Sequence, residues 1–203
     1  MNHPFLVGEK VYLRALTEAD LTGNYFQWFN DQEVCRYNSH GAYPNSLARM
    51  QSYFARTQQD ASLLALAIVD KATDVHVGNI ALQEINWLSR SAEYAIVLGE
   101  KDYWGKGLGM EASTLILEHA FCRLNLFRVY CGTSADNLPM QKLAKHMGMQ
   151  QEGVRRSAIY KNGFYRDIYE YGILREDYLE RRTKSGSNAM HSENILEPAF
   201  NSE

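Results

Sequence analysis

Three glycines stand at alternate positions in one short segment, which reads Tyr103-Trp104-Gly105-Lys106-Gly107-Leu108-Gly109-Met110. The segment follows a predicted strand and opens a predicted helix. Glycine lets a backbone approach a ligand closely, and the first amide groups of a helix have no partner inside the helix. The helix dipole also favours negative charge at this end. These features indicate an anion site that a diphosphate would fit.

Two familiar phosphate motifs do not describe this segment. No GxxxxGK[ST] pattern occurs in the chain, so the turn is not a Walker loop. A dinucleotide fingerprint would need a small residue at Met110, and the preceding elements are predicted to be hairpins rather than a βαβ unit. An ordinary glycine-rich turn would also explain the pattern, so the glycines alone do not decide the function.

The strand predicted just before this turn carries one carboxylate, Glu93. Strand alternation places Glu93, Ala95 and Val97 on one face. Both faces hold mostly apolar or small residues, as expected of a central strand covered on both sides. A carboxylate there would be partly desolvated and suited to act as a general base. A solvated glutamate on the surface of the strand is an equally good interpretation.

The segment from Ala92 to Ala112 resembles the coenzyme-A-binding motif of the GNAT superfamily, in the branch of RimJ/RimL-type and spermidine acetyltransferases. That motif is usually Arg/Gln-x-x-Gly-x-Gly/Ala. Gly107 and Gly109 match it, while Trp104 stands where Arg or Gln is usual. Later segments resemble the family's next motif and its C-terminal hairpin, at 137–148, 152–155 and 160–167. The resemblance covers about residues 8–178.

The resemblance implies an acetyl-CoA-dependent N-acetyltransferase with roles for particular residues. Three strand residues would offer backbone groups to the pantetheine arm, namely Ile96, Val97 and Leu98. The turn would wrap the diphosphate with backbone amides, over Trp104, Gly105, Lys106, Gly107, Leu108, Gly109 and Met110. Asn137 would lie beside the pantetheine or the thioester. Family members often protonate the leaving thiolate with a tyrosine at the position of Ala144, so the general acid stays open.

The acceptor side is less defined. An alkylamine with a pKa near 10.4 is mostly protonated at neutral pH and must lose a proton before it attacks the thioester. Glu93, acting through a water, is the first candidate base. His76 and Glu84 are better explained as structural or surface groups, and Tyr130 as core. Trp28 and Asp31 are candidates for binding the acceptor, although core packing and a solvated loop explain them as well.

Hydrophobic periodicity predicts an α/β (α+β) domain. Strands are expected at 11–16, 63–69, 75–82, 92–98, 127–131, 154–160 and 164–174, and helices at about 21–29, 46–57, 107–123 and 137–147. Short turns join neighbouring strands into antiparallel hairpins. The expected fold is GNAT-like, with a mixed, largely antiparallel central sheet flanked by helices on both faces. A single domain would span 1–182, and the polar, aperiodic tail at 183–203 would be disordered.

Composition narrows the function classes. The 203 residues are 45% hydrophobic and 22% charged, with a net charge of −3, which argues against a nucleic-acid partner. No apolar run is long enough for a membrane span, and no histidine pair has metal-ligand spacing, so neither a membrane nor a metal is expected. Three cysteines without close spacing, and an N-terminus unlike a signal peptide, favour a cytoplasmic protein.

Three functions remain open at this point. The favoured acceptor is a primary amine of a small molecule, such as an amino sugar, a polyamine or a drug-like amine. A protein N-terminus, as in the ribosomal-protein acetyltransferases, is the alternative. A non-catalytic acyl-CoA-binding sensor is the third. The acyl-chain preference and the oligomeric state, including a homodimer, are also left open.

Overall fold

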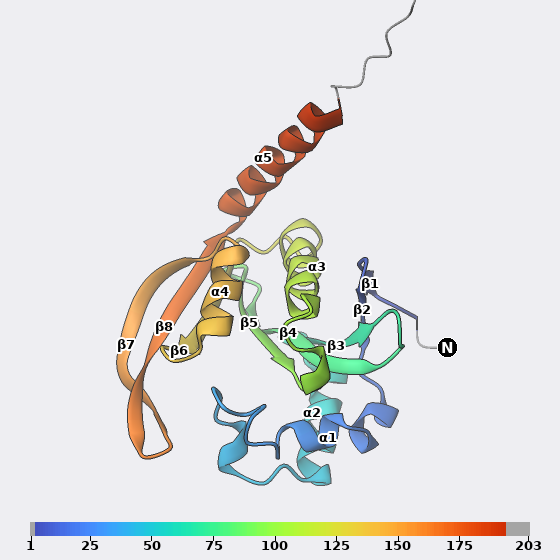
Figure 1. Ribbon diagram of the computed structural model, residues 1–203, viewed down its shortest axis with the longest axis vertical. Coiled ribbons are helices and arrows are strands. Elements are labelled where there is room, and N and C mark those ends of the chain that lie inside the picture. Colours follow the sequence, from blue (N-terminus) through green and yellow to red (C-terminus); the bar gives the residue numbers. More distant parts are fainter. Residues whose placement is uncertain (1–2, 194–203) are drawn as a thin grey trace, which may run out of the picture.

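The computed structural model describes residues 3–193, and it is built on one eight-stranded sheet (Figure 1). The strand order is β1-β2-β3-β4-β5-β6-β8-β7. Every neighbouring pair is antiparallel except β5 and β6, which are parallel. The strands are β1 Leu6–Val7, β2 Val11–Ala15, β3 Leu64–Asp70, β4 His76–Asn86, β5 Ser91–Leu98, β6 Arg128–Ser134, β7 Gln150–Lys161 and β8 Phe164–Leu174. This confirms the expected mixed, largely antiparallel sheet.

Helices cover both faces of the sheet, as expected (Figure 1). They are α1 Tyr25–Trp28, α2 Leu47–Gln59, α3 Leu108–Cys122, α4 Leu138–His146 and α5 Arg175–Glu193, with short 3-10 turns η1 Glu18–Thr22, η2 His40–Ala42 and η3 Lys101–Tyr103. The α3 and α4 side buries the larger core, which includes Ala92 and Tyr94 of β5. The α1 and α2 side buries a second core around Tyr25, Trp28 and Ala81.

Local sequence signals explain several helix boundaries. The Ser46 hydroxyl accepts the Arg49 amide at the start of α2, as expected of a serine cap. Gly148, with φ +88°, follows the end of α4 in the left-handed conformation that glycine tolerates. The helix predicted over 21–29 is instead divided into η1 and α1, because the chain leaves helical geometry at Gly23, whose φ and ψ are −89° and −162°.

The C-terminal helix departs from the expectation of a tail without structure after residue 182. α5 continues to Glu193 and projects away from the sheet (Figure 1). Its first turns are anchored, because Tyr178 is buried with its ring 4.9 Å from that of Phe121. Once a turn is formed, each further residue adds a hydrogen bond at little extra cost, so a polar segment can continue a helix without an apolar stripe. The remainder of the expected tail, 194–203, lies outside the described residues.

Candidate active site

Strands β5 and β6 pair over a short stretch and then part. The parallel pairing joins Ser91, Ala92 and Glu93 to Arg128, Val129 and Tyr130. Beyond Glu93, β5 continues to Leu98 with β4 as its partner, and β6 continues to Ser134 with β8 as its partner. Main-chain groups on the facing edges of the diverging strands therefore have no strand partner in the sheet. Such an edge can bind an extended ligand through backbone hydrogen bonds.

The glycine turn lies directly beyond the open end of β5. Gly105 and Gly107 adopt φ values of +75° and +84°, which side chains other than glycine rarely tolerate. Gly107 is the N-cap of α3, and the turn from Trp104 to Gly107 is exposed. A Cβ built on Gly109 would lie 3.2 Å from Leu98 Cδ1, so the start of α3 packs closely on β5. The geometry matches the anion site inferred from the sequence.

Trp104 occupies the position where Arg or Gln is usual, and its role is visible in the structure. The indole Nε1 donates to the Leu98 carbonyl oxygen at 2.9 Å, which ties the turn to the end of β5. That carbonyl already has a partner, so a pantetheine arm would have to use other main-chain groups of the 96–98 stretch.

A diverging parallel strand pair that leads to a glycine turn at a helix N-terminus is the arrangement expected of a coenzyme-A site. Residues 10–150 match the family described as "Acetyltransferase (GNAT) domain". The chain belongs to the GNAT acetyltransferases. GNAT enzymes transfer an acetyl group from acetyl-CoA, so the protein is an acetyl-CoA-dependent N-acetyltransferase and the non-catalytic sensor is set aside.

Relatives of this GNAT chain share its length and shape. An N-acetyltransferase called p20, from Bacillus licheniformis, is 28% identical over 177 residues, which is 85% of this chain and 97% of that one. A spermidine N(1)-acetyltransferase of Vibrio cholerae is 31% identical over 114 residues, covering 56% of this chain and 65% of the relative. The crystal structure of a Vibrio cholerae spermidine N-acetyltransferase with CoA and spermine superposes with a TM-score of 0.78 at 26% identity, covering 85% and 99% of the two chains.

Glu93 lies at the point where the GNAT strands diverge. It forms the last β5–β6 register pair, opposite Tyr130, and it is half-buried, as the sequence predicts. Gln83 on β4 donates from Nε2 to Glu93 Oε2 at 2.8 Å, which fixes the carboxylate. Because Glu93 alternates with the core residues Ala92 and Tyr94, it faces the α1 and α2 side of the sheet.

Tyr130 was expected in the core, and this is wrong. It alternates with buried Val129 and Cys131 and is half-buried on the same face as Glu93. Burial and the negative charges of Glu84, Glu93 and Glu170 raise the pKa of Tyr130. The apolar run around Tyr130 gave no signal of the correct face, because a strand buried on both sides has the same composition.

The negative charges of three carboxylates thus act on Tyr130, and we call Glu84, Glu93 and Glu170 the acidic cluster. Glu84 reaches it through an irregularity in β4, where the residue adopts φ +51° and the register with β5 shifts. Glu170 lies over Gly132, since a Cβ on that glycine would be 3.2 Å from Glu170 Oε1. The sequence analysis favoured Glu93 and treated Glu84 as a structural or surface group, and it did not name Glu170, because the pairing of β6 with β8 is a contact between distant segments.

His76 is a structural group, as the sequence analysis favoured. Its Nδ1 lies 3.2 Å from Asp20 Oδ1, and its Nε2 lies 2.8 Å from Asn79 Oδ1. Arg14 donates to both Asp20 oxygens at 2.8 Å. Burial by itself would raise the pKa of Asp20, but hydrogen bonds from Arg14, His76 and the Thr17 amide outweigh it and hold this pKa well below its usual range. The network joins β2, η1 and β4 on the α1 and α2 side of the sheet.

Trp28 and Asp31 line a hollow of about 260 Å³ together with the segment that follows β5. Trp28 is buried, and its Nε1 donates to Glu100 Oε1 at 2.9 Å. Asp31 Oδ2 pairs with Lys101 Nζ at 2.9 Å. Both residues therefore connect the N-terminal loop to residues 99–102, which lead into the glycine turn. Their contact with an acceptor stays a prediction.

Asn137 is the N-cap of α4, just after the end of β6, and Ala144 lies within the helix. The Asn137 side chain accepts the Met140 amide at 3.2 Å and so caps the helix. This gives Asn137 a structural role alongside the predicted contact with the pantetheine. Ala144 is fully buried in the core. An alanine has no hydroxyl, so this position of α4 cannot protonate the thiolate.

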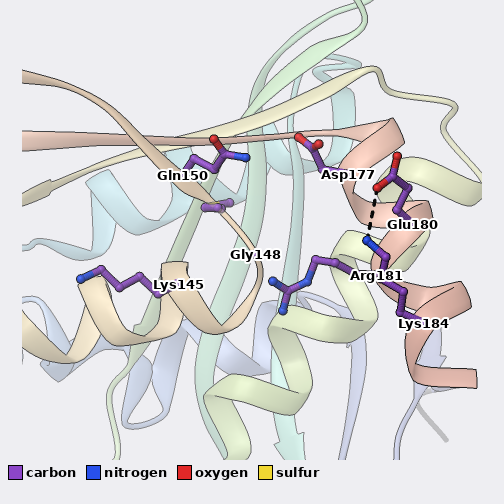
Figure 2. Close-up of a pocket in the computed structure, with 8 residues that line it drawn as sticks. Lys145, Gly148, Gln150, Asp177, Glu180, Arg181 and Lys184 are labelled. Atoms are coloured by element: carbon purple, nitrogen blue, oxygen red, sulfur yellow. Dashed lines mark ion pairs between the residues drawn. The ribbon is translucent and has the colours of Figure 1, made fainter. Parts of the chain in front are cut away.

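A larger hollow than that beside Trp28 lies elsewhere, between the end of α4, the start of β7 and α5 (Figure 2). It has a volume of about 390 Å³ and mixed charge. Arg181 reaches across it to donate to the His146 carbonyl at 3.0 Å, which satisfies the C-terminus of α4. No residue of the glycine turn or of β5 lines it. The same described residues contain no cluster suited to a metal ion and no helix with the length and apolarity to cross a membrane.

Proposed function

We propose that this GNAT enzyme acetylates a primary amine of a small cationic molecule, with polyamines as the first class to test. The observation that supports this is the acidic cluster around Tyr130, at the point where β5 and β6 diverge. Carboxylates attract a protonated amine, and a second carboxylate can hold the second cation of a diamine. The spermidine acetyltransferases among the relatives act on such amines.

In the proposed mechanism the chain holds the two substrates and moves one proton. Acetyl-CoA supplies an activated thioester. The amides of the glycine turn bind the diphosphate, and the open edge of β5 at Ile96–Leu98 orients the arm. Glu93 accepts a proton from the ammonium through a water and passes it to solvent. The free amine then forms the C–N bond as the C–S bond breaks, and the new amide nitrogen releases its second proton to solvent. The leaving thiolate takes a proton from solvent.

Glu84 is the candidate for the second cation. It is exposed, and among the residues described it forms no ion pair, whereas Glu170 pairs with Arg155 at 2.5 Å. A diamine bound with one nitrogen at Glu93 could place its other ammonium near Glu84. A protein N-terminus carries one amine and no second cation unless a lysine follows, so Glu84 separates the two acceptor classes.

The test is a thiol-release assay with acetyl-CoA and a panel of acceptors: spermidine, a diamine, butylamine, an amino sugar and short peptides. We expect kcat/KM for the polyamine to exceed that for butylamine by about tenfold or more, as one additional ion pair in a partly desolvated site would give. Glu84→Gln should remove most of this preference while sparing butylamine. Glu176→Gln, which changes an exposed glutamate on α5, is the matched control.

Turnover of peptides alone would overturn the small-molecule proposal in favour of a protein N-terminus. The pH profile gives independent evidence, because an α-amino group has a pKa of about 7.7–8.0 and an alkylamine about 10.4. The rate with a polyamine should therefore keep rising with pH after the rate with a peptide levels off. A homodimer and a cytoplasmic location stay predictions.

A further inference from the structure

The turn between β1 and β2 lies against the first turn of α3, although the two are far apart in sequence. The Glu111 carboxylate accepts the Lys10 amide at 2.9 Å and the Val11 amide at 3.4 Å, both at Oε1. A Cβ on Gly8 would lie 1.9 Å from the same oxygen, so a side chain there would displace the Glu111 carboxylate. Glu111 therefore holds the backbone of Lys10 in a fixed place beside the diphosphate site.

The Lys10 ammonium extends toward the glycine turn. A Cβ built on Gly107 would lie 3.8 Å from Lys10 Nζ. Two other lysines of this region have protein partners: Lys71 Nζ donates to the Gly8 carbonyl at 2.8 Å, and Lys106 Nζ lies 4.9 Å from the centre of the Tyr103 ring. Among residues 3–184, whose side chains the structure describes, Lys10 Nζ has no hydrogen bond or ion pair. It is an exposed cation next to Gly107, the N-cap of α3.

The charge of Glu111 explains why a lysine is needed at position 10. Glu111 lies one helical turn after Gly107, and its amide donates to the Gly107 carbonyl at 3.1 Å. A carboxylate so near the start of α3 would repel a diphosphate bound there. The backbone amides of Lys10 and Val11 stabilise that carboxylate, and the Lys10 side chain places a positive charge on the side where the anion would bind.

We propose that Lys10 is a ligand of the acetyl-CoA diphosphate and completes the site formed by the amides of the glycine turn. The ammonium makes a charge-assisted hydrogen bond to a phosphate oxygen next to Gly107. Lys10 lies outside every motif that the sequence analysis used. The inference concerns coenzyme binding and does not depend on which amine is acetylated.

The test is the dissociation constant of CoA and acetyl-CoA, measured by calorimetry on the full chain. Lys10→Met keeps the aliphatic stem and removes the charge, and we expect about tenfold to a hundredfold weaker binding, the usual range for losing a hydrogen bond to a charged group. Lys10→Arg should bind within a few-fold of the wild type. Lys71→Met is the matched control, because it removes a positive charge from the same neighbourhood but from a lysine bound to Gly8.

If Lys10→Met and Lys71→Met lose the same affinity for acetyl-CoA, the effect comes from the overall positive charge of this surface and not from a contact of Lys10. That result would overturn the proposal. Dephospho-CoA separates the phosphates: a loss that persists with it supports the diphosphate, and a loss that disappears moves the contact to the 3′-phosphate and contradicts the assignment. Gly8→Ala should displace the Glu111 carboxylate, release the Lys10 amide from it and weaken binding with Lys10 still present, while circular dichroism and Tm report whether the variant is folded. If the folded Gly8→Ala variant binds normally, the role given to Glu111 is wrong.

Discussion

At the scale of single residues, the position of Glu93 follows from where the pairing of β5 and β6 ends. Its carboxylate is half-buried, is fixed by Gln83 and lies opposite Tyr130. A base at this place can accept a proton from an amine that approaches the thioester from the α1 and α2 side.

Glu93→Gln keeps the shape of the side chain and removes the proton acceptor. We expect kcat to fall by about 10²-fold, the low end for general-base catalysis, with the affinity for acetyl-CoA unchanged within a few-fold. The loss should shrink as pH rises, because more of the amine is then already neutral. Measuring kcat against pH for both proteins checks this, and equal rates throughout would assign Glu93 a structural role.

At the scale of elements, the sequence predicted the helices and strands that local residue patterns determine. The Ser46 cap, the glycine after α4 and the alternation of β5 are visible in neighbouring residues, and they placed most helices and strands within a few positions. The partly exposed face of Tyr130, the place of Glu84 near it and the turn that carries Lys10 were missed, because each depends on pairing between separate strands. β1 was missed because two residues are too few to show a period.

The network that joins β2, η1 and β4 should contribute substantially to stability. Asp20→Asn leaves Arg14 buried with a weaker partner, which should cost about 3–5 kcal/mol, as for other broken buried pairs. Glu118→Gln, which breaks an exposed pair with Arg182, is the control and should leave the Tm nearly unchanged. Urea unfolding of both variants measures the difference.

The same network gives a pH dependence with a definite sign. The pKa of Asp20 is depressed in the folded state, so its contribution is present above the usual aspartate pKa of about 3.9 and is lost as pH falls below it. The wild type should therefore lose stability faster than Asp20→Asn on acidification. Parallel losses would show that the carboxylate is not charged in the folded protein.

A chain ending after Arg182 tests the domain boundary. It keeps Tyr178 against Phe121 and Arg181 on the end of α4. We expect its Tm and its affinity for acetyl-CoA to match those of the full chain, because the removed segment is polar and lacks the apolar periodicity of a packed helix. A large drop in either quantity would show that the segment beyond Arg182 docks on the domain or on another molecule.

At the scale of the whole molecule, the sheet separates two cores and the proposed site lies where its strands open between them. A ligand that binds there contacts elements from both halves of the fold. Binding to the folded state alone should therefore stabilise the entire domain.

Acetyl-CoA at about 100 times its dissociation constant should raise the free energy of unfolding by about 2.7 kcal/mol. Gly107→Val should abolish the effect, because a β-branched residue is strained at φ +84° and would obstruct the turn. Gly153→Val is the control, since a Cβ there has no atom within 4 Å and φ is not positive. Thermal shift with and without acetyl-CoA measures both, and normal stabilisation of the Gly107 variant would place the phosphate site elsewhere.

The contact between Trp28 and Gly99 constrains how this chain could have diverged from its relatives. A Cβ on Gly99 would lie 1.8 Å from the indole ring, so any larger residue at 99 is incompatible with tryptophan at 28. Neither position can drift alone without a clash or a cavity. Across the family, the two columns of an alignment should therefore covary, with glycine opposite a large aromatic residue and a bulkier residue at 99 opposite a smaller one at 28.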